Sequence, residues 1–255
     1  MKIWTGAAMS EITRHYDELL AEHYSWMVGV PFEEKVAEQR ALLEGLGLCA
    51  GSHGTAIDLG CGPGYQSAAL FDLGFERVIA IDTSAALIEE LKAQQGVRAI
   101  EPVLGDMRGF AEWVAPGGAD AIVCMGDTLT HLETRADLSR LLADALSALA
   151  PGGVLVLTFR DFSQELIGLD RFIAVRGDRE RVMTCFLEYE PETVVVHDLV
   201  HVREDAGWKL AKSRYRKLRL PPNEVVARLR DVGFEIQADS AAGRMWAIKA
   251  RKPRE

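Results

Sequence analysis

Residues 55–67 read TAIDLGCGPGYQS and predict a strand, a glycine-rich turn and the start of a helix. The apolar run Thr55–Leu59 is followed within five positions by Gly60, Gly62 and Gly64. Such a turn lets a ligand lie against the main chain, because no Cβ stands between them. The first N–H groups of the helix add a partly positive rim. The spacing G-x-G-x-G is one residue shorter than the dinucleotide fingerprint G-x-G-x-x-G. This difference in length indicates that the turn binds a cofactor other than a dinucleotide.

A second apolar run, Arg77–Asp82, also ends in an acid. Asp82 lies 20 positions beyond Gly62, close to the spacing of about 20 residues between such a turn and a ribose-binding carboxylate. A carboxylate at this place can accept hydrogen bonds from both ribose hydroxyls. The two residues therefore predict a ribose site where the first two strands end.

Two further apolar runs end in glycine and acidic residues. Ala99–Leu104 precedes Gly105–Met107, and Asp120–Cys124 precedes Met125–Asp127. Apolar strands separated by helices are typical of a parallel sheet covered on both faces. Open α/β sheets bind their ligands at the edge where the strands end. We therefore expect an α/β fold with its site at this edge.

The pattern of helices and strands changes along the chain. We expect helices over residues 10–28, 32–46, 63–73, 84–95, 134–148 and 221–232, with Ser10 as the N-cap of the first. We expect strands over residues 55–59, 77–82, 99–104, 120–124, 154–159, 234–238 and 245–250. Between the two series, residues 172–176, 181–190, 193–203 and 208–219 are joined by short turns and predict antiparallel hairpins.

These elements predict one domain over residues 1–255 with four parts. A helical N-terminal cap covers 10–47, and a ligand-binding core covers 55–160. An antiparallel insertion covers 171–219 and follows the fifth strand. A closing helix and hairpin cover 221–250.

The motifs resemble, in order, those of the S-adenosylmethionine (SAM)-dependent methyltransferases with a Rossmann-like fold. The resemblance is carried by Asp58–Gly64, Asp82, Gly105-Asp106 and the turn Leu149–Gly153. It covers about residues 55–160 and resumes near 220–250. It implies a seven-stranded, mostly parallel sheet with helices on both faces, extended here by the N-terminal cap and the insertion.

The resemblance also implies SAM as cofactor and S-adenosyl-L-homocysteine as product. The methionine part of SAM would lie against Gly60 and Gly62, and Asp82 would hold the ribose hydroxyls. Asp106, with Met107, would face the adenine amino group. Asp58 would steady the loop and the ammonium group of the methionine part. The cofactor-binding residues that we expect are Tyr16, Arg40, Asp58, Gly60, Cys61, Gly62, Gly64, Asp82, Thr83, Gly105, Asp106, Met107 and Met125.

Four residues of the N-terminal helices have two interpretations each. Tyr16 and Trp26, with Tyr24 between them, could close over SAM, and the resemblance favours this role for Tyr16. Arg40 could pair with the SAM carboxylate, since guanidinium binds carboxylates through two hydrogen bonds. Aromatic residues at helical spacing usually pack in a core, and a single arginine usually faces solvent. The sequence favours these ordinary roles for Trp26 and Arg40.

Residues 124–132 follow the fourth strand and form the expected wall beside the transferred methyl group. Asp127 and His131 are four positions apart and could face one side of a helical turn. His131 could act as a base, and Asp127 could bind an acceptor amine. Alternatively, Asp127 caps the turn and His131 lies at the surface or in the core. The segment lacks both the Asn/Asp-Pro-Pro-aromatic pattern and a Pro-Cys nucleophile, which favours a small-molecule acceptor over nucleic acid or protein.

The insertion contains a second polar group. His197 and His201 fall on one face of their strand, and Arg214 and Arg216 fall on one face of the next. They could receive an anionic acceptor or form a solvated outer face. The spacing of the histidines on a strand disfavours a metal site.

Composition narrows the classes of function. The chain has 255 residues, of which 48% are hydrophobic, and a formal net charge of −9, which disfavours nucleic acid and anionic membranes as partners. It has no apolar run long enough to span a bilayer, and residues 1–10 lack a signal-peptide core, so we expect a cytoplasmic protein. Its four cysteines are widely spaced, which disfavours disulfides and a metal site.

The sequence thus predicts a SAM-dependent methyltransferase that transfers a methyl group to nitrogen or oxygen of a small molecule by in-line displacement. One alternative is a non-catalytic SAM-binding or interaction protein. Another is an NAD(P)-dependent oxidoreductase, which should carry the longer glycine fingerprint. The sequence identifies neither the acceptor nor the oligomeric state.

Overall fold

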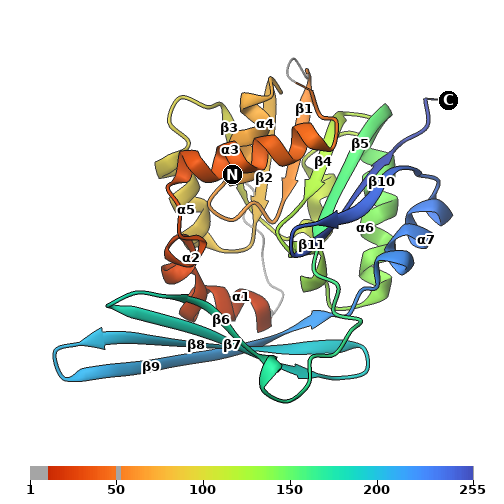
Figure 1. The fold of residues 1–255 in the computed structure, drawn as a ribbon. Coiled ribbons are helices and arrows are strands. Elements are labelled where there is room, and N and C mark those ends of the chain that lie inside the picture. Colours follow the sequence, from red (N-terminus) through yellow and green to blue (C-terminus); the bar gives the residue numbers. More distant parts are fainter. Residues whose placement is uncertain (1–10, 50–52, 255) are drawn as a thin grey trace.

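The computed structural model describes residues 11–49 and 53–254. Its centre is a seven-stranded sheet with the order β10-β11-β5-β4-β1-β2-β3 (Figure 1). The strands are β1 (Thr55–Leu59), β2 (Arg77–Asp82), β3 (Ile100–Leu104), β4 (Ala119–Cys124), β5 (Leu149–Phe159), β10 (Glu235–Ala242) and β11 (Met245–Arg251). Strands β1 to β5 are parallel, whereas β11 pairs antiparallel with both β5 and β10. The expected Rossmann-like sheet is confirmed.

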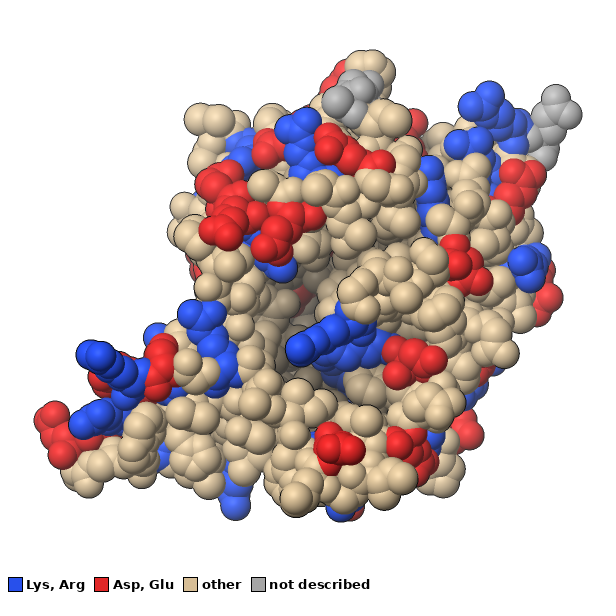
Figure 2. All heavy atoms as spheres, in the orientation of Figure 1, with Lys and Arg blue, Asp and Glu red and all other residues tan. Residues whose placement is uncertain are grey.

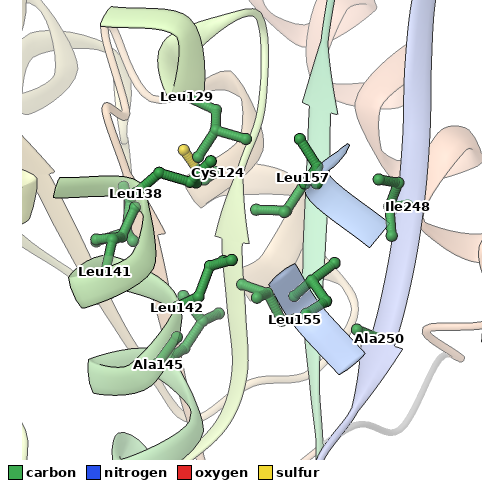
Figure 3. Packing of buried hydrophobic residues seen from close by; sticks show 14 of the residues in the cluster. Cys124, Leu129, Leu138, Leu141, Leu142, Ala145, Leu155, Leu157, Ile248 and Ala250 are labelled. Atoms are coloured by element: carbon green, nitrogen blue, oxygen red, sulfur yellow. The ribbon is translucent and has the colours of Figure 1, made fainter. Parts of the chain in front are cut away.

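Helices cover both faces of this sheet because successive strand residues point to opposite sides. The helices are α3 (Phe32–Gly45), α4 (Tyr65–Asp72), α5 (Ala85–Gln94), α6 (Arg135–Ala148) and α7 (Pro222–Val232). Ala56 of β1 packs with α3, α4 and α5, whereas Ile57 packs with α6 and α7. Figure 3 shows the second layer, where Leu138 and Leu142 of α6 face Cys124 and Leu155 of the sheet. Two apolar layers therefore hold the strand ends in place.

The N-terminal segment is one continuous helical rod with an irregular centre. It consists of α1 (Glu11–His15), a π-helical turn η1 (Tyr16–Leu20) and α2 (Ala21–Val28). Gly29 ends it in the left-handed conformation, with φ of 85°. The sequence predicted a plain helix here, because a π-turn has no local signal in the side-chain pattern. Ser10, the expected N-cap, lies outside the described residues.

A second, four-stranded antiparallel sheet follows β5. Its strands are β6 (Phe172–Gly177), β7 (Arg181–Tyr189), β8 (Thr193–Glu204) and β9 (Gly207–Leu218), in that order. Leu19 and Leu20 of the π-turn pack on Met183 and Val200 of this sheet. Figure 1 shows α1 lying between the two sheets. The insertion thus encloses the N-terminal rod from the side opposite the core.

Several element boundaries differ from expectation, among them the starts of β5 and α4 and the end of β10, which reaches Ala242 instead of residue 238. Strand β5 begins at Leu149, not near residue 154, because Leu149 pairs with Ala119 before the register shifts at the following turn. Helix α4 begins at Tyr65, since Gly64 before it has φ of 94° and is not helical. Three 3₁₀ turns were not expected: η2 (Met107–Glu112), η3 (Thr128–His131) and η4 (Gly168–Arg171). No helix within 11–49 or 53–254 has the length and apolar character needed to cross a bilayer.

Candidate active site

The glycine turn after β1 is held against the end of β2. Gly60 and Gly62 have φ of 72° and 54°, a region that glycine adopts readily. The N–H groups of Gly60 and Cys61 donate to the Ile81 carbonyl oxygen at 2.8 and 3.0 Å. A Cβ at Gly60 would lie 2.2 Å from Cγ2 of Thr128, so no other residue fits there. The turn is thereby fixed against both neighbouring strands.

Asp82 at the end of β2 faces this turn. Its Oδ2 accepts from the Gly62 N–H at 2.8 Å, and its Oδ1 accepts from the Ser84 N–H at 2.8 Å. Burial raises the pKa of Asp82, although these backbone donors oppose the shift. A carboxylate has about four acceptor positions, so two hydrogen bonds leave capacity for hydroxyl donors. The predicted partners Gly62 and Asp82 therefore meet, and the acid retains free acceptor positions.

A cavity, partly open to solvent, lies at this edge of the sheet. The predicted site residues that line it are Tyr16, Gly60, Cys61, Gly62, Asp82, Thr83, Gly105, Asp106, Met107, Met125 and His131. They come from the π-turn and from the ends of β1, β2, β3 and β4.

Three of the expected cofactor-binding residues lie away from the cavity. Arg40 on α3 is partly exposed and donates to Glu44 at 3.0 Å, so it faces solvent, the ordinary role of a single arginine. Asp58 is buried behind the turn and accepts from the Ser67 hydroxyl at 2.6 Å. A side chain at Gly64 would meet Leu91 instead of the cavity. Asp58 thus ties β1 to α4, which steadies the loop without contact to the cavity.

Asp106 forms the far end of the cavity together with a residue that the sequence did not single out. Its Oδ1 accepts from the Arg108 N–H at 2.8 Å, and its Oδ2 accepts from the Arg108 guanidinium at 2.6 Å. Arg108 also lies 3.4 Å from Glu133. Arg108 and Glu133 both line the cavity. Arg108 therefore orients Asp106, and Arg108 and Glu133 add one charge of each sign at this end of the cavity.

Asp127 is the clearest departure from the expected geometry. It is 2% exposed and, among the described residues, the one non-glycine residue with positive φ, at 83°. Its carboxylate accepts from Lys217 of β9, from the Arg160 N–H at 3.0 Å and from the Thr130 hydroxyl at 3.2 Å. Burial alone would raise the pKa of Asp127, but Lys217 and Arg160 outweigh it and lower the pKa. Asp127 lies behind the cavity wall, and its carboxylate is engaged in an ion pair.

His131, at the end of η3, lines the cavity four residues after Asp127 but does not share its side. Burial lowers the pKa of His131 well below its usual value, and the nearby Lys217 adds to the effect. Its Nδ1 is buried and has no hydrogen-bond partner among the described residues. Its ring lies 6.0 Å from that of Tyr16 and 5.6 Å from that of Tyr215. The site therefore holds a neutral imidazole with an unused nitrogen.

The geometry agrees with comparisons to known proteins. Residues 56–153 match the family model of the methyltransferase domain. Residues 56–153 therefore form a domain of the SAM-dependent methyltransferase superfamily. The glycine/sarcosine N-methyltransferase of Halorhodospira halochloris is 34% identical over 42% of this chain and 40% of its own length. The trans-aconitate 2-methyltransferase of Paracidovorax citrulli is 37% identical over 52% of this chain and 48% of its own length. The chain spans less than half the length of these curated relatives.

The superfamily fold extends over nearly the whole chain. The structure of the CcbJ methyltransferase from Streptomyces caelestis superposes with a TM-score of 0.76 at 21% identity, covering 97% of this chain and 100% of that one. At this identity the likeness concerns the fold alone. It includes both the methyltransferase core and the region of the second sheet.

Within this methyltransferase fold, the N-terminal rod supplies an aromatic wall. Tyr16 and Tyr24 line the cavity, with ring centres 6.3 Å apart. The Tyr24 ring lies 3.8 Å from the place where a Cβ on Gly62 would stand. Trp26 points elsewhere, because its Nε1 donates to Asp178 in the β6–β7 turn at 2.5 Å. Trp26 also packs against the cluster that contains Leu19 and Met183, which agrees with the ordinary packing role that the sequence favoured for it.

The polar residues of the second sheet lie outside the methyltransferase cavity. His197 borders a shallow groove on the outer face with Phe172 and Arg214, and its Nε2 lies 3.1 Å from Glu188. Arg216 pairs with Glu190. These contacts favour the solvated-face interpretation. Gly126, Thr128 and Leu132 line the cavity and belong to the expected wall at residues 124–132. The cavity residues that the sequence did not single out are Ile12, Tyr65, Gln66, Ile81, Leu87, Arg108 and Glu133.

Proposed function

We propose that the chain transfers a methyl group from SAM to a nitrogen or oxygen atom of a small molecule by in-line displacement. The observation that carries the proposal is the pairing of Asp82 with the Gly62 N–H on the wall of a cavity that also contains His131. In this proposal the cofactor binds at the ends of β1 and β2, and the reaction takes place beside His131, after β4. When bound, SAM supplies a methyl group on a positively charged sulfur.

The residues present fit this cofactor. At Gly62 the space in front of the main chain is open as far as the Tyr24 ring, which leaves room for the methionine part. The remaining acceptor positions of Asp82 suit the two ribose hydroxyls. Met107, Leu87 and Ile81 line the cavity and supply an apolar surface for an adenine ring. This assignment does not use Arg40, Asp58 or Gly64.

His131 has the properties of a proton acceptor for the reaction. Its low pKa keeps the imidazole neutral near pH 7, and its unpartnered Nδ1 can take a proton from an amine or hydroxyl. A general base contributes about 10²–10⁴-fold to rate. Tyr16 and Tyr215 pack around the imidazole and hold its orientation. The enclosing walls align the methyl donor with the acceptor, and this alignment supplies the larger share of the rate enhancement.

A small acceptor suits the enclosure of the site. The cavity lies between the π-turn and the strand ends, with the second sheet behind the rod. The curated relatives named above act, by their names, on glycine and sarcosine or on trans-aconitate. The formal net charge of −9 adds to the argument against nucleic acid.

The first experiment separates cofactor classes. Calorimetric titration with SAM, S-adenosylhomocysteine and NADH should show binding of the two adenosyl compounds. Binding of NADH without either adenosyl compound would refute the proposal and favour an oxidoreductase.

The second experiment separates an enzyme from a binding protein. Transfer of tritiated methyl from SAM is measured into libraries of amines, phenols and carboxylates. Transfer into one class, reduced at least about 10²-fold in His131→Gln, supports the proposed role of the imidazole. Adenosyl binding without any transfer would favour the non-catalytic alternative.

A further inference from the structure

Exposed apolar side chains are concentrated on one surface of the molecule. Nine large apolar side chains of the described residues are exposed, and seven of them lie within residues 166–210. They belong to the second sheet and to the segment that leads into it: Leu166, Ile167, Leu169, Phe172, Val182, Trp208 and Leu210. A single exposed apolar residue is ordinary, whereas a concentration of them on one surface is typical of a docking site.

The strand register places the sheet members of this group on its outer face. Met183 and Val200 pack against the N-terminal rod, so the residues next to them in each strand point away from it. Four rows of paired residues cross this outer face: Phe172, Phe186, His197 and Arg214; Ala174, Thr184, Leu199 and Lys212; Val182, His201 and Leu210; and Arg203 and Trp208. Figure 2 shows the second sheet from the side as a mostly uncharged layer below the core.

The turn η4 lies beside the first of these rows. Its last residue, Arg171, has its guanidinium over the Phe186 ring, 4.8 Å from the centre. Ile167 and Leu169, at the start of the turn, are 82% and 84% exposed. We call the four rows together with Ile167 and Leu169 the outer patch.

The outer patch also carries cations without partners. Arg203, Lys212 and Arg214 lie in its rows, and none of them has an acid within ion-pair distance in the described part of the chain. Glu188 is the one acid among the outward-pointing residues of these described strands, and it lies 3.1 Å from His197. The outer patch is therefore both apolar and positively charged.

The net charge of the whole chain does not decide which partner this patch accepts. The formal net charge is −9, but charges more than about 8 Å apart are largely screened at physiological ionic strength. Figure 1 shows α3, which carries Glu34 and Glu44, on the far side of the core from the second sheet. The local charge therefore governs docking here, and it attracts anions.

The shape of the patch favours a lipid bilayer over a protein surface. A protein partner would need pockets to bury Ile167 and Leu169, whereas a bilayer accepts protruding apolar side chains without shape complementarity. The patch itself offers a partner only a shallow groove, with Phe172, Phe186 and Leu199 among the residues that line it. Such a surface suits a deformable phase.

The residue types agree with this choice. Trp208 is 51% exposed at one end of the patch, and aromatic side chains of this kind lie at the headgroup level of membranes. Lys212 and Arg214 supply the basic groups that anionic lipids attract. A second copy of the chain, packed face to face on the same patch, would instead set these cations against identical cations.

We propose that the outer patch docks the protein on an anionic lipid bilayer. Ile167 and Leu169 enter the boundary between headgroups and acyl chains, and Lys212 and Arg214 face the lipid phosphates. The second sheet and the N-terminal rod separate this patch from the cavity. The inference concerns a second surface and depends neither on the acceptor nor on the proposed reaction.

Flotation with lipid vesicles tests the proposal. The full chain is mixed with vesicles of phosphatidylcholine alone, or of phosphatidylcholine with about 30% phosphatidylglycerol. We expect partitioning onto the anionic vesicles to be at least about tenfold stronger at about 0.1 M salt. Most of this binding should be lost at about 0.5 M salt, because the attraction is screened.

An apolar variant tests the turn. Leu169→Asp should lower partitioning onto the anionic vesicles about tenfold, because it removes an apolar contact and adds a negative charge at the lipid surface. Val97→Asp is the matched control, since Val97 is a fully exposed apolar residue outside the patch. The change in net charge is the same, and partitioning should stay within about twofold.

A charge variant tests the strands. Lys212→Gln/Arg214→Gln should lower partitioning onto the anionic vesicles about tenfold or more and leave that onto phosphatidylcholine unchanged. Arg77→Gln/Lys92→Gln removes two exposed cations of the core and is the matched control. It should stay within about twofold. Thermal unfolding and circular dichroism show that each variant remains folded.

Several results would overturn the inference. They include absent partitioning, equal partitioning onto both kinds of vesicle, and undiminished binding in Leu169→Asp or Lys212→Gln/Arg214→Gln. Sedimentation equilibrium without lipid tests for a second copy, and a dimer that Leu169→Asp dissociates would assign the patch to self-association. Binding of polyglutamate without binding of vesicles would assign it to an acidic protein.

Discussion

The two walls of the cavity are built in different ways. The wall at the end of the parallel strands consists mainly of main chain and short turns, as at Gly60 and Gly62, with Asp82 held by backbone N–H groups. The opposite wall consists of side chains from the N-terminal rod, such as Tyr16 and Tyr24. The second sheet, on which this rod packs, is tied to the first wall by a buried ion pair between Lys217 of β9 and Asp127. A fixed wall of main chain suits a constant cofactor, whereas a wall of side chains can change with the acceptor.

The largest effect should come from breaking the connection between the walls. Lys217→Met leaves the buried carboxylate of Asp127 without its nearest cation, which should cost about 3–5 kcal/mol of unfolding free energy. Urea unfolding measures it. The double variant Lys217→Met/Asp127→Asn should recover part of the loss. Lys209→Met, at an exposed pair with Glu204, should change stability by less than about 0.5 kcal/mol. A similar small change for Lys217→Met would contradict this role for the buried pair.

On the main-chain wall, Gly62→Val should weaken binding of S-adenosylhomocysteine about 100-fold, or about 2.7 kcal/mol. The new side chain would fill the space between the turn and Tyr24. Gly96→Val is the matched control, because Gly96 has a similar φ of 63° but open space around its Cβ position. Both variants carry backbone strain, but only the first should lose affinity in calorimetry. Equal affinities would mean that the turn does not touch the ligand.

Asp82→Ala should weaken the same binding by more than about 1.5 kcal/mol, because ribose hydroxyls and two backbone N–H groups lose their acceptor. Asp82→Asn keeps one side-chain oxygen and should lose less. The measurement is again calorimetric titration. Unchanged affinity in the alanine variant would remove Asp82 from the site.

A smaller effect concerns the support beneath the glycine turn. Burial raises the pKa of Asp58 from 3.8 to about 7, although the Ser67 hydroxyl opposes the shift. The folded chain therefore binds a proton that the unfolded chain releases, and stability falls as the pH rises through this range. Between pH 6 and 7 the wild type should lose about 1 kcal/mol relative to Asp58→Asn in urea unfolding of the ligand-free protein. Parallel pH profiles for the two chains would contradict the buried, protonated Asp58.

The smallest effect is expected at a residue that lies on neither wall. Arg40→Gln removes an exposed pair with Glu44 and should leave affinity for S-adenosylhomocysteine within about twofold. A tenfold loss of affinity in calorimetry would instead place Arg40 in the cofactor site.

The same contrast explains what the sequence could predict. The turn at residues 60–64 and its partner Asp82 were predictable, because main-chain geometry leaves a local pattern of glycines and acids. Lys217 was not, since it lies 90 positions from Asp127 and meets it only after the second sheet has formed. Neither interpretation of Asp127, acceptor binding or capping of the turn, included this ion pair, because its spacing from His131 says nothing of a partner on another strand.

The irregular turn at Tyr16–Leu20 has a consequence for how this chain tolerates change in length. A π-turn accommodates one residue more than the same stretch of α-helix. Loss of one residue there would restore a regular α-helix and leave α1 and α2 close to their present orientation, with His15 beside Asp198 and Tyr24 over the glycine turn. Loss of one residue from α1 or α2 would instead rotate the flanking segments relative to each other by about 100°. A single deletion within Tyr16–Leu20 should therefore be better tolerated than one in either flanking helix.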